Sequence, residues 1–364
     1  MSAAKAAIAN FFMDVLSQGY AFFCSSNRFS RSLKLSCRNS PDESICLAAG
    51  TIPLHDRWES RYPRRLTMCD DFTLEQEEAA LKRMKLSRRQ FAASVGVAGG
   101  AGAIAALSPA GNTAMAHGSG GLMEGNVSFP SEDGTIDAYF VRPMGGKHPA
   151  VILWPDIAGL RESYETLAIS IANEGYAVLA MNQYYRDAKA PVLGSFMEWR
   201  TDEGRAKLRP MINNLSSDAV MRDAKAAVAY LDAHEDVDTA RGIGSCGYCM
   251  GGPFTVYSTA AAPDRVKAAA SFHGGGLVRD DDNSPHKLMQ TTQASYLFAI
   301  AENDDAKAPN DKVELRKAAD ASGRPAEIEV YPAAHGWCTL DSPVYDKEQA
   351  EKAWRRMLVL FAGL

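Results

Sequence analysis

The sequence from Gly125 to the C-terminus predicts an α/β fold, with a mostly parallel central sheet flanked by helices on both faces. Segments with the pattern of strands alternate with segments with the pattern of helices throughout this part of the chain. Two strand segments, Ala150–Trp154 and Tyr176–Met181, are continuous apolar runs, as expected for strands buried on both faces. Asp218–His234 has the apolar spacing of a long amphipathic helix.

Local signals predict the first elements of this fold. Asn126–Phe129 and Thr135–Arg142 have the pattern of short strands, and residues 131–134 between them predict a hairpin turn. Glu162–Asn173 is predicted as a helix that Gly175 caps.

The second half of this region continues the alternation, and we find no internal repeat. The polar and aromatic stretch from Asn182 to about Ser217 predicts a loop and a short helix over the sheet edge. Four further strands and a closing helix are predicted at Arg241–Cys246, Val266–Phe272, Ser295–Ala301, Ala326–Tyr331 and Gln349–Phe361.

The composition limits the classes of function. Of the 364 residues, 46% are apolar and 23% are charged, which is typical of a globular protein with one large domain or two ordinary ones. The formal net charge is −5 and the region after Gly125 has no basic stripe, so nucleic acid is not expected as a partner. Seven cysteines are too few for a disulfide scaffold.

Residues 68–116 contain the three parts of a twin-arginine export signal. The motif Ser87-Arg88-Arg89-Gln90-Phe91 is followed by a run rich in glycine and alanine up to Leu107, and then by the A-x-A cleavage site at 114–116. The run is shorter than the about 20 residues of a membrane span. We predict export to the periplasm by the twin-arginine machinery, with the signal either cleaved, which leaves no stable membrane partner, or kept as an anchor. The alternative is a buried helix.

Residues 1–67 show no sustained periodicity and precede a signal that normally lies near the start of a chain. Met68 is a plausible start. We interpret residues 1–67 as a spurious extension from a misplaced start codon, or as a real extension that is disordered or cleaved. Residues 117–364 are then the folded α/β domain.

The segment from Gly247 to Gly251 contains the pattern G-x-C-x-G, which predicts a nucleophile elbow with cysteine in place of serine. Such a nucleophile sits on a tight turn between a strand and a helix, where a Cβ on either glycine would collide with the neighbouring backbone. The helix N-terminus favours the thiolate of Cys249. Two alternatives are a dithiol redox pair, Cys246 and Cys249, and a structural turn with a buried cysteine.

An elbow enzyme needs an acid and then a histidine, in that order along the chain. The strand Ser295–Ala301 is followed by Glu302-Asn303-Asp304-Asp305, and a carboxylate just past the end of this strand reaches the edge of the sheet where the site is expected. His335 lies on the loop before the final helix, where the general base is expected; alone, it could equally be a packed loop histidine.

The remaining site residues are expected on the loops at this edge. The backbone N–H groups of Met250 and Ile157 are the candidate oxyanion donors, and His273 follows a strand and is a candidate pocket residue. No cluster of cysteine and histidine has the spacing of metal ligands, so we expect neither a metal nor an organic cofactor.

These residues resemble a known family. The stretch from about Gly125 to Leu364 resembles the dienelactone hydrolases of the α/β-hydrolase fold, whose elbow G-Y-C-[LM]-G-G is similar to residues 247–252. The resemblance implies a triad of Cys249, His335 and Asp304, with Asp305 as the alternative acid.

The resemblance also implies roles in substrate binding. Asp156 occupies the position of an acidic residue that contacts the resting thiol, and Tyr184 and Arg186 resemble a segment whose arginine binds the substrate carboxylate. A second family arginine, four residues past the histidine, is Thr339 here, so half of the carboxylate clamp is missing.

We therefore predict a hydrolase that cleaves a small ester or lactone through a Cys-His-Asp triad and a thioacyl-enzyme intermediate. The alternatives are a redox protein that uses Cys246 and Cys249, and a non-catalytic binding module on a hydrolase scaffold.

Overall fold

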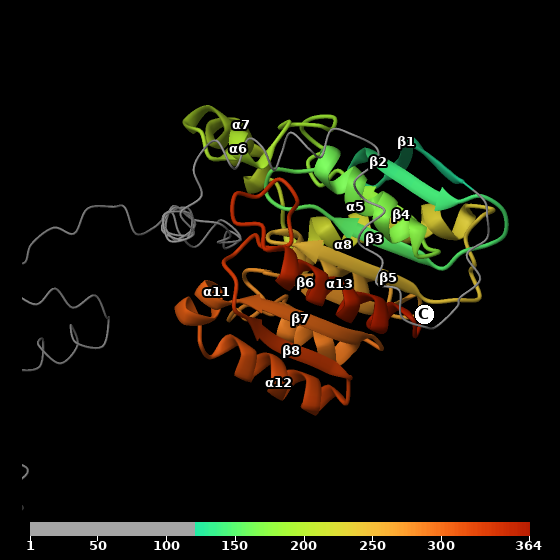
Figure 1. Cartoon of the computed structure of the whole chain (residues 1–364). Coiled ribbons are helices and arrows are strands. Elements are labelled where there is room, and N and C mark those ends of the chain that lie inside the picture. Colours follow the sequence, from blue (N-terminus) through green and yellow to red (C-terminus); the bar gives the residue numbers. More distant parts are fainter. Residues whose placement is uncertain (1–120) are drawn as a thin grey trace, which may run out of the picture. The chain divides into compact units, whose positions relative to one another are not determined.

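The computed structural model describes residues 121–364, which form an eight-stranded sheet with helices packed on it (Figure 1). The predicted export signal and residues 1–67 lie outside the described residues. The strands are β1 (Leu122–Ser131), β2 (Gly134–Pro143), β3 (Ala150–Trp154), β4 (Ala177–Met181), β5 (Ile243–Tyr248), β6 (Val266–Phe272), β7 (Ser295–Ala301) and β8 (Ala326–Tyr331).

The helices follow the strands as predicted for an α/β protein. They are α5 (Glu162–Asn173), α6 (Phe196–Trp199), α7 (Asp202–Asn213), α8 (Ser217–Ala233), α9 (Gly251–Ala261), α10 (Pro285–Leu288), α11 (Glu302–Lys307), α12 (Asp311–Ser322) and α13 (Lys347–Phe361), with a short 3-10 turn η6 at Met289–Thr291.

The strand order is β1-β2-β4-β3-β5-β6-β7-β8. β2 pairs antiparallel with both β1 and β4, and β3 to β8 are parallel to one another. The predicted mostly parallel sheet is therefore confirmed. Because the C-terminal ends of parallel strands meet at one edge of the sheet, the loops after β3 to β8 gather there.

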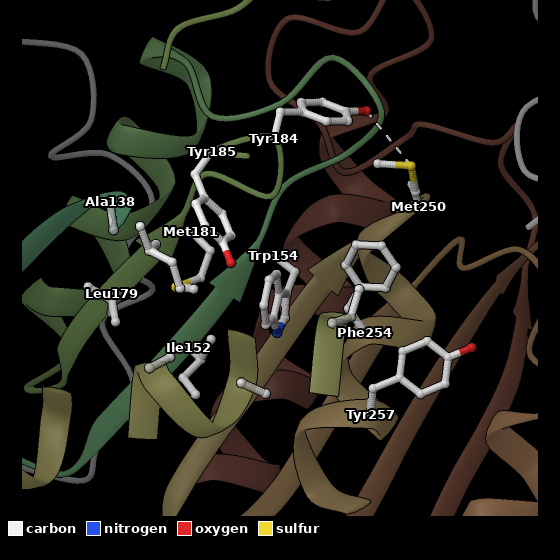
Figure 2. Packing of buried hydrophobic residues seen from close by; sticks show 14 of the residues in the cluster. Ala138, Ile152, Trp154, Leu179, Met181, Tyr184, Tyr185, Met250, Phe254 and Tyr257 are labelled. Atoms are coloured by element: carbon white, nitrogen blue, oxygen red, sulfur yellow. Dashed lines mark hydrogen bonds between the residues drawn. The ribbon is translucent and has the colours of Figure 1, made fainter. Parts of the chain in front are cut away.

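Successive residues of the central strands point to opposite faces of the sheet. On β3, Val151 and Leu153 pack in a core with residues of α5 and α13. Ile152 and Trp154 pack in a second core with residues of α8 and α9 (Figure 2). Both strand faces are fully buried, which explains why the sequence of β3 is a continuous apolar run.

The helices that were not predicted include α7 and α12, and the bounds of β1, β2, β4 and β5 differ from the predicted ones. α7 lies in the stretch predicted as loop and short helix; it contains Pro210 and buries only Gly204 and Leu208. α12 buries only one narrow stripe of small and apolar residues, so its sequence has a weak helical signal. β5 extends two residues further than predicted, because Tyr248 continues the pairing with Phe272 of β6.

Within residues 121–364, no helix combines the length and apolarity that crossing a membrane requires, and no group of three or more histidine, cysteine or acidic side chains is arranged to hold a metal ion.

Candidate active site

The predicted elbow lies between β5 and α9. Cys249 is buried and has a φ of 53°, a left-handed backbone conformation that is unfavourable for any residue other than glycine. Its N–H donates a hydrogen bond to the carbonyl of Phe272 at 3.0 Å, and its carbonyl accepts one from the N–H of Gly252 at 3.0 Å. The strained turn is thus held from the sheet on one side and from the helix on the other.

The two glycines of the elbow pattern are needed for close backbone packing. A Cβ on Gly247 would lie 2.0 Å from the carbonyl oxygen of Gly251, and a Cβ on Gly251 would lie 2.4 Å from that of Trp154. Neither distance is possible for a real side chain, so the predicted reason for these glycines is confirmed. The close packing fixes Cys249 immediately before the N-terminus of α9, where the helix dipole favours a thiolate.

His335 lies on the loop after β8 and is held by two side chains that follow β7. Its Nδ1 is 2.7 Å from Oδ2 of Asp304, and its backbone N–H donates to Oδ1 of Asn303 at 2.8 Å. Asp305 instead accepts hydrogen bonds from Nζ of Lys312 at 2.7 and 2.6 Å. Of the two candidate acids, the structure therefore brings Asp304 to the histidine.

The electrostatics of His335 favour its charged form. Burial alone would lower its pKa, but the negative charges of Asp304 and Cys249, together with side-chain hydrogen bonds to both, raise the pKa well above its ordinary value of 6.5. With Nδ1 bonded to Asp304, the other ring nitrogen is the one available to Cys249. This arrangement stabilises an imidazolium beside a thiolate.

The loop after β3 forms a tight turn. The N–H of Gly159 donates to the carbonyl of Asp156 at 3.0 Å, and the N–H of Ala158 donates to the carboxylate of Asp156 at 2.9 Å. Among the hydrogen bonds of residues 121–364, none has the N–H of Ile157 or of Met250 as its donor. Both residues are almost fully buried.

A sequence model of the dienelactone hydrolase family matches residues 136–364, which is more than half of the chain. The chain belongs to the dienelactone hydrolase family.

Individual family members are similar along most of their length. A "Putative carboxymethylenebutenolidase" of Methylorubrum extorquens is 29% identical over 261 residues, which are 70% of this chain and 86% of the relative. A "Probable 2-oxo-3-(5-oxofuran-2-ylidene)propanoate lactonase" of Bradyrhizobium sp is 27% identical over 229 residues, which are 61% of this chain and 87% of the relative. The crystal structure of a "Putative Dienelactone Hydrolase" from Klebsiella pneumoniae has a TM-score of 0.59 at 26% identity, and the match covers 67% of this chain and 100% of that chain.

The acidic residue that the dienelactone hydrolase resemblance assigns to the resting thiol has a different partner here. Both carboxylate oxygens of Asp156 accept hydrogen bonds from Arg161, at 2.8 and 2.9 Å, and both side chains are almost fully buried. Arg161 also binds Asp341, whose Oδ2 accepts a hydrogen bond from the N–H of Phe196 at 2.8 Å. Asp156 is thus part of an internal ion network that joins the loop after β3, the loop after His335 and the start of α6.

Replacing Arg161 by methionine is expected to lower the free energy of unfolding by about 3–5 kcal/mol, because Asp156 would remain buried, and Asp341 partly buried, without their cation. Urea unfolding at neutral pH measures the loss. The matched control, Arg209→Met on the exposed surface of α7, is expected to change stability by less than about 0.5 kcal/mol. An equal effect of the two substitutions would contradict a stabilising role for the network.

The arginine predicted to bind a substrate carboxylate, Arg186, is already paired with carboxylates of the protein itself. Arg186 donates to both oxygens of Asp223, at 2.9 and 2.7 Å, and to Asp133 at 2.6 Å, and it stacks on the ring of Tyr185. The prediction of a substrate contact is therefore not supported. The guanidinium instead ties the β1–β2 turn to α8.

Tyr184, also predicted to bind substrate, is buried among residues of the site. Its hydroxyl donates to the carbonyl of Ile157 at 2.7 Å and lies 3.8 Å from the sulfur of Met250 (Figure 2). Tyr184 therefore contacts both of the residues whose N–H groups are the predicted oxyanion donors.

His273 packs directly against the predicted base. Its ring centroid is 4.8 Å from that of His335 and 5.1 Å from that of Trp337. Burial and the charge of His335 lower the pKa of His273 well below 6.5, so this ring is neutral at neutral pH. His273, predicted as a pocket residue, therefore packs as a neutral ring against His335.

Two residues of the site were missed by the sequence analysis. Arg161 closes the ion network, and Gln183 donates from Nε2 to the carbonyl of Asp156 at 2.7 Å. Neither belongs to a motif, and the only signal was their position in loops that directly follow buried strands.

Proposed function

We propose that this dienelactone hydrolase family member cleaves a small ester or lactone with Cys249 as its nucleophile. The observation that carries the proposal is the buried line of hydrogen bonds from Cys249 through His335 to Asp304, with Cys249 on a strained turn at a helix N-terminus. A positioned thiolate, a histidine and an orienting carboxylate are the groups that acyl transfer requires.

The proposed reaction has two steps. The thiolate of Cys249 attacks the acyl carbonyl, and the N–H groups of Met250 and Ile157 stabilise the oxyanion. The carbon–oxygen bond of the ester breaks as His335 gives its proton to the departing alkoxide, which leaves a thioacyl enzyme. His335 then takes a proton from water, the hydroxide attacks the thioester, and the carbon–sulfur bond breaks, which releases the acid and restores the thiolate of Cys249 beside the imidazolium of His335.

We further propose that the substrate carries no carboxylate next to the reacting carbonyl. The family resemblance implies two arginines for such a group; one position is Thr339, and Arg186 is already bound by Asp133 and Asp223. Losing a bidentate guanidinium changes the recognition of anions strongly.

A screen of the purified protein against uncharged aryl esters, uncharged lactones and lactones that carry a carboxylate tests both proposals. We expect the protein to release acid from the uncharged compounds. Alkylation of Cys249 by iodoacetamide is expected to stop this turnover. No turnover by any compound would favour the non-catalytic binding module. Preference for the charged lactones would contradict the proposed substrate class.

We also propose that the protein is exported to the periplasm by the twin-arginine machinery, on the ground of the motif at 87–91 and the A-x-A site at 114–116. Replacing Arg88 and Arg89 by lysine is expected to keep the precursor in the cytoplasm, as measured by cell fractionation.

A chain that starts at His117 is expected to melt at the same temperature as the full chain and to remain active. Unfolding of that shorter chain would contradict the processing of residues 1–116.

A further inference from the structure

We propose that Gln183 is a positioning residue for the oxyanion hole, which it serves by holding the peptide group that presents the N–H of Ile157. The proposal rests on the proposed function, because it concerns the same acyl transfer.

Gln183 lies on the loop directly after β4, and its side chain is 1% exposed. Its Nε2 donates to the carbonyl oxygen of Asp156 at 2.7 Å, and the N–H of Gly159 donates to the same oxygen at 3.0 Å. The N–H of Ile157 belongs to the same peptide group as this carbonyl. Because the C=O and N–H of a planar trans peptide point in opposite directions, fixing the oxygen of Asp156 fixes the direction of the Ile157 N–H.

The next residue of the loop holds the following peptide group. The hydroxyl of Tyr184 donates to the carbonyl of Ile157 at 2.7 Å and reaches the sulfur of Met250 (Figure 2). Gln183 and Tyr184 therefore clamp the peptide groups on both sides of Ile157. A preorganised donor needs this kind of support, because an N–H that must reorient during the reaction stabilises the transition state less.

A purely structural role does not explain a glutamine at this position. Within the described part of the chain, Oε1 of Gln183 is buried and has no hydrogen-bond partner. An unpaired buried amide oxygen costs stability, and an apolar side chain of the same length would avoid that cost. Stability and catalysis therefore respond differently when Gln183 is replaced, which allows the two roles to be separated.

The test compares Gln183→Met with the wild type in four measurements. Methionine has a similar length and cannot donate to the carbonyl of Asp156. We expect kcat for an uncharged aryl ester to fall by roughly 10- to 100-fold, which is less than the 10²- to 10³-fold loss for deleting an oxyanion donor. The melting temperature should stay unchanged or rise. Alkylation of Cys249 by iodoacetamide should keep its rate, because that displacement forms no oxyanion.

The fourth measurement, protection by an aldehyde, does not depend on ester turnover. Butyraldehyde adds to the thiolate to form a hemithioacetal, whose oxygen occupies the oxyanion hole, and so it protects Cys249 from iodoacetamide. We expect this protection to need at least about 10-fold more aldehyde in Gln183→Met, since the same donor stabilises the adduct. Gln293→Met, the same substitution on the exposed loop before β7, serves as the matched control and is expected to match the wild type.

The outcomes separate this inference from the proposed function. If the wild type hydrolyses esters and Gln183→Met does so equally well, the positioning role is wrong and the function stands. If the wild type hydrolyses no ester but Gln183→Met still weakens aldehyde protection, the function is wrong and the positioning role stands. A fall in melting temperature with parallel losses of hydrolysis and alkylation would make Gln183 a structural residue and overturn the inference.

Discussion

Cys249→Ala is expected to lower ester turnover by roughly 10⁶-fold, in line with the removal of the nucleophile from a serine triad. The thiolate forms the acyl bond, so without it His335 and Asp304 have no nucleophile to activate. Steady-state hydrolysis of an uncharged aryl ester measures the loss. Circular dichroism is expected to show an unchanged fold, because Cys249 is held through its backbone, which alanine retains.

Cys246→Ser is the matched control and is expected to keep most of the activity. Cys246 packs in the core with α5 and α13, and burial raises the pKa of its thiol well above the ordinary value. Cys249 belongs to the other core, with α8 and α9. If Cys246→Ser were as inactive as Cys249→Ala and the protein reduced disulfides, the dithiol redox interpretation would be right.

Asp304→Asn is expected to lower ester turnover by up to ~10⁴-fold, because an amide in place of the carboxylate leaves the histidine in the wrong tautomer. The 2.7 Å contact between His335 Nδ1 and Asp304 Oδ2 is the basis of this expectation. Asp305→Asn should have a far smaller effect, since Asp305 is bound to Lys312. Measuring kcat/KM for both variants gives the ranking, and the reverse ranking would contradict Asp304 as the triad acid.

The fold could be predicted from the sequence because its signals are local. The buried strands of the parallel sheet are continuous apolar runs, and the main helices have regular apolar spacing. α7 and α12 were missed because each buries only two or three residues, so tertiary packing rather than an apolar stripe determines them.

Some features of the candidate site could likewise be predicted from local sequence signals, and others could not. The elbow glycines, Cys249 and His335 follow from short motifs and from their order along the chain. The ion pairs of Arg161 and Arg186 do not, because carboxylates that bind them come from distant segments: Asp341 reaches Arg161 across 180 positions, and Asp133 reaches Arg186 across 53. A sequence shows which residues are charged, but only the fold decides which charges meet.

The contact between α6 and the ion network has a consequence for substitutions at position 196. Asp341 binds this helix through the backbone N–H of Phe196, not through a side chain. Every residue except proline carries that N–H, so a substitution at position 196 other than proline keeps the tether, although it loses the packing of the buried Phe196 ring in the core. Proline at position 196 would remove the tether and the packing together, and so it is expected to loosen α6 more than any other residue there.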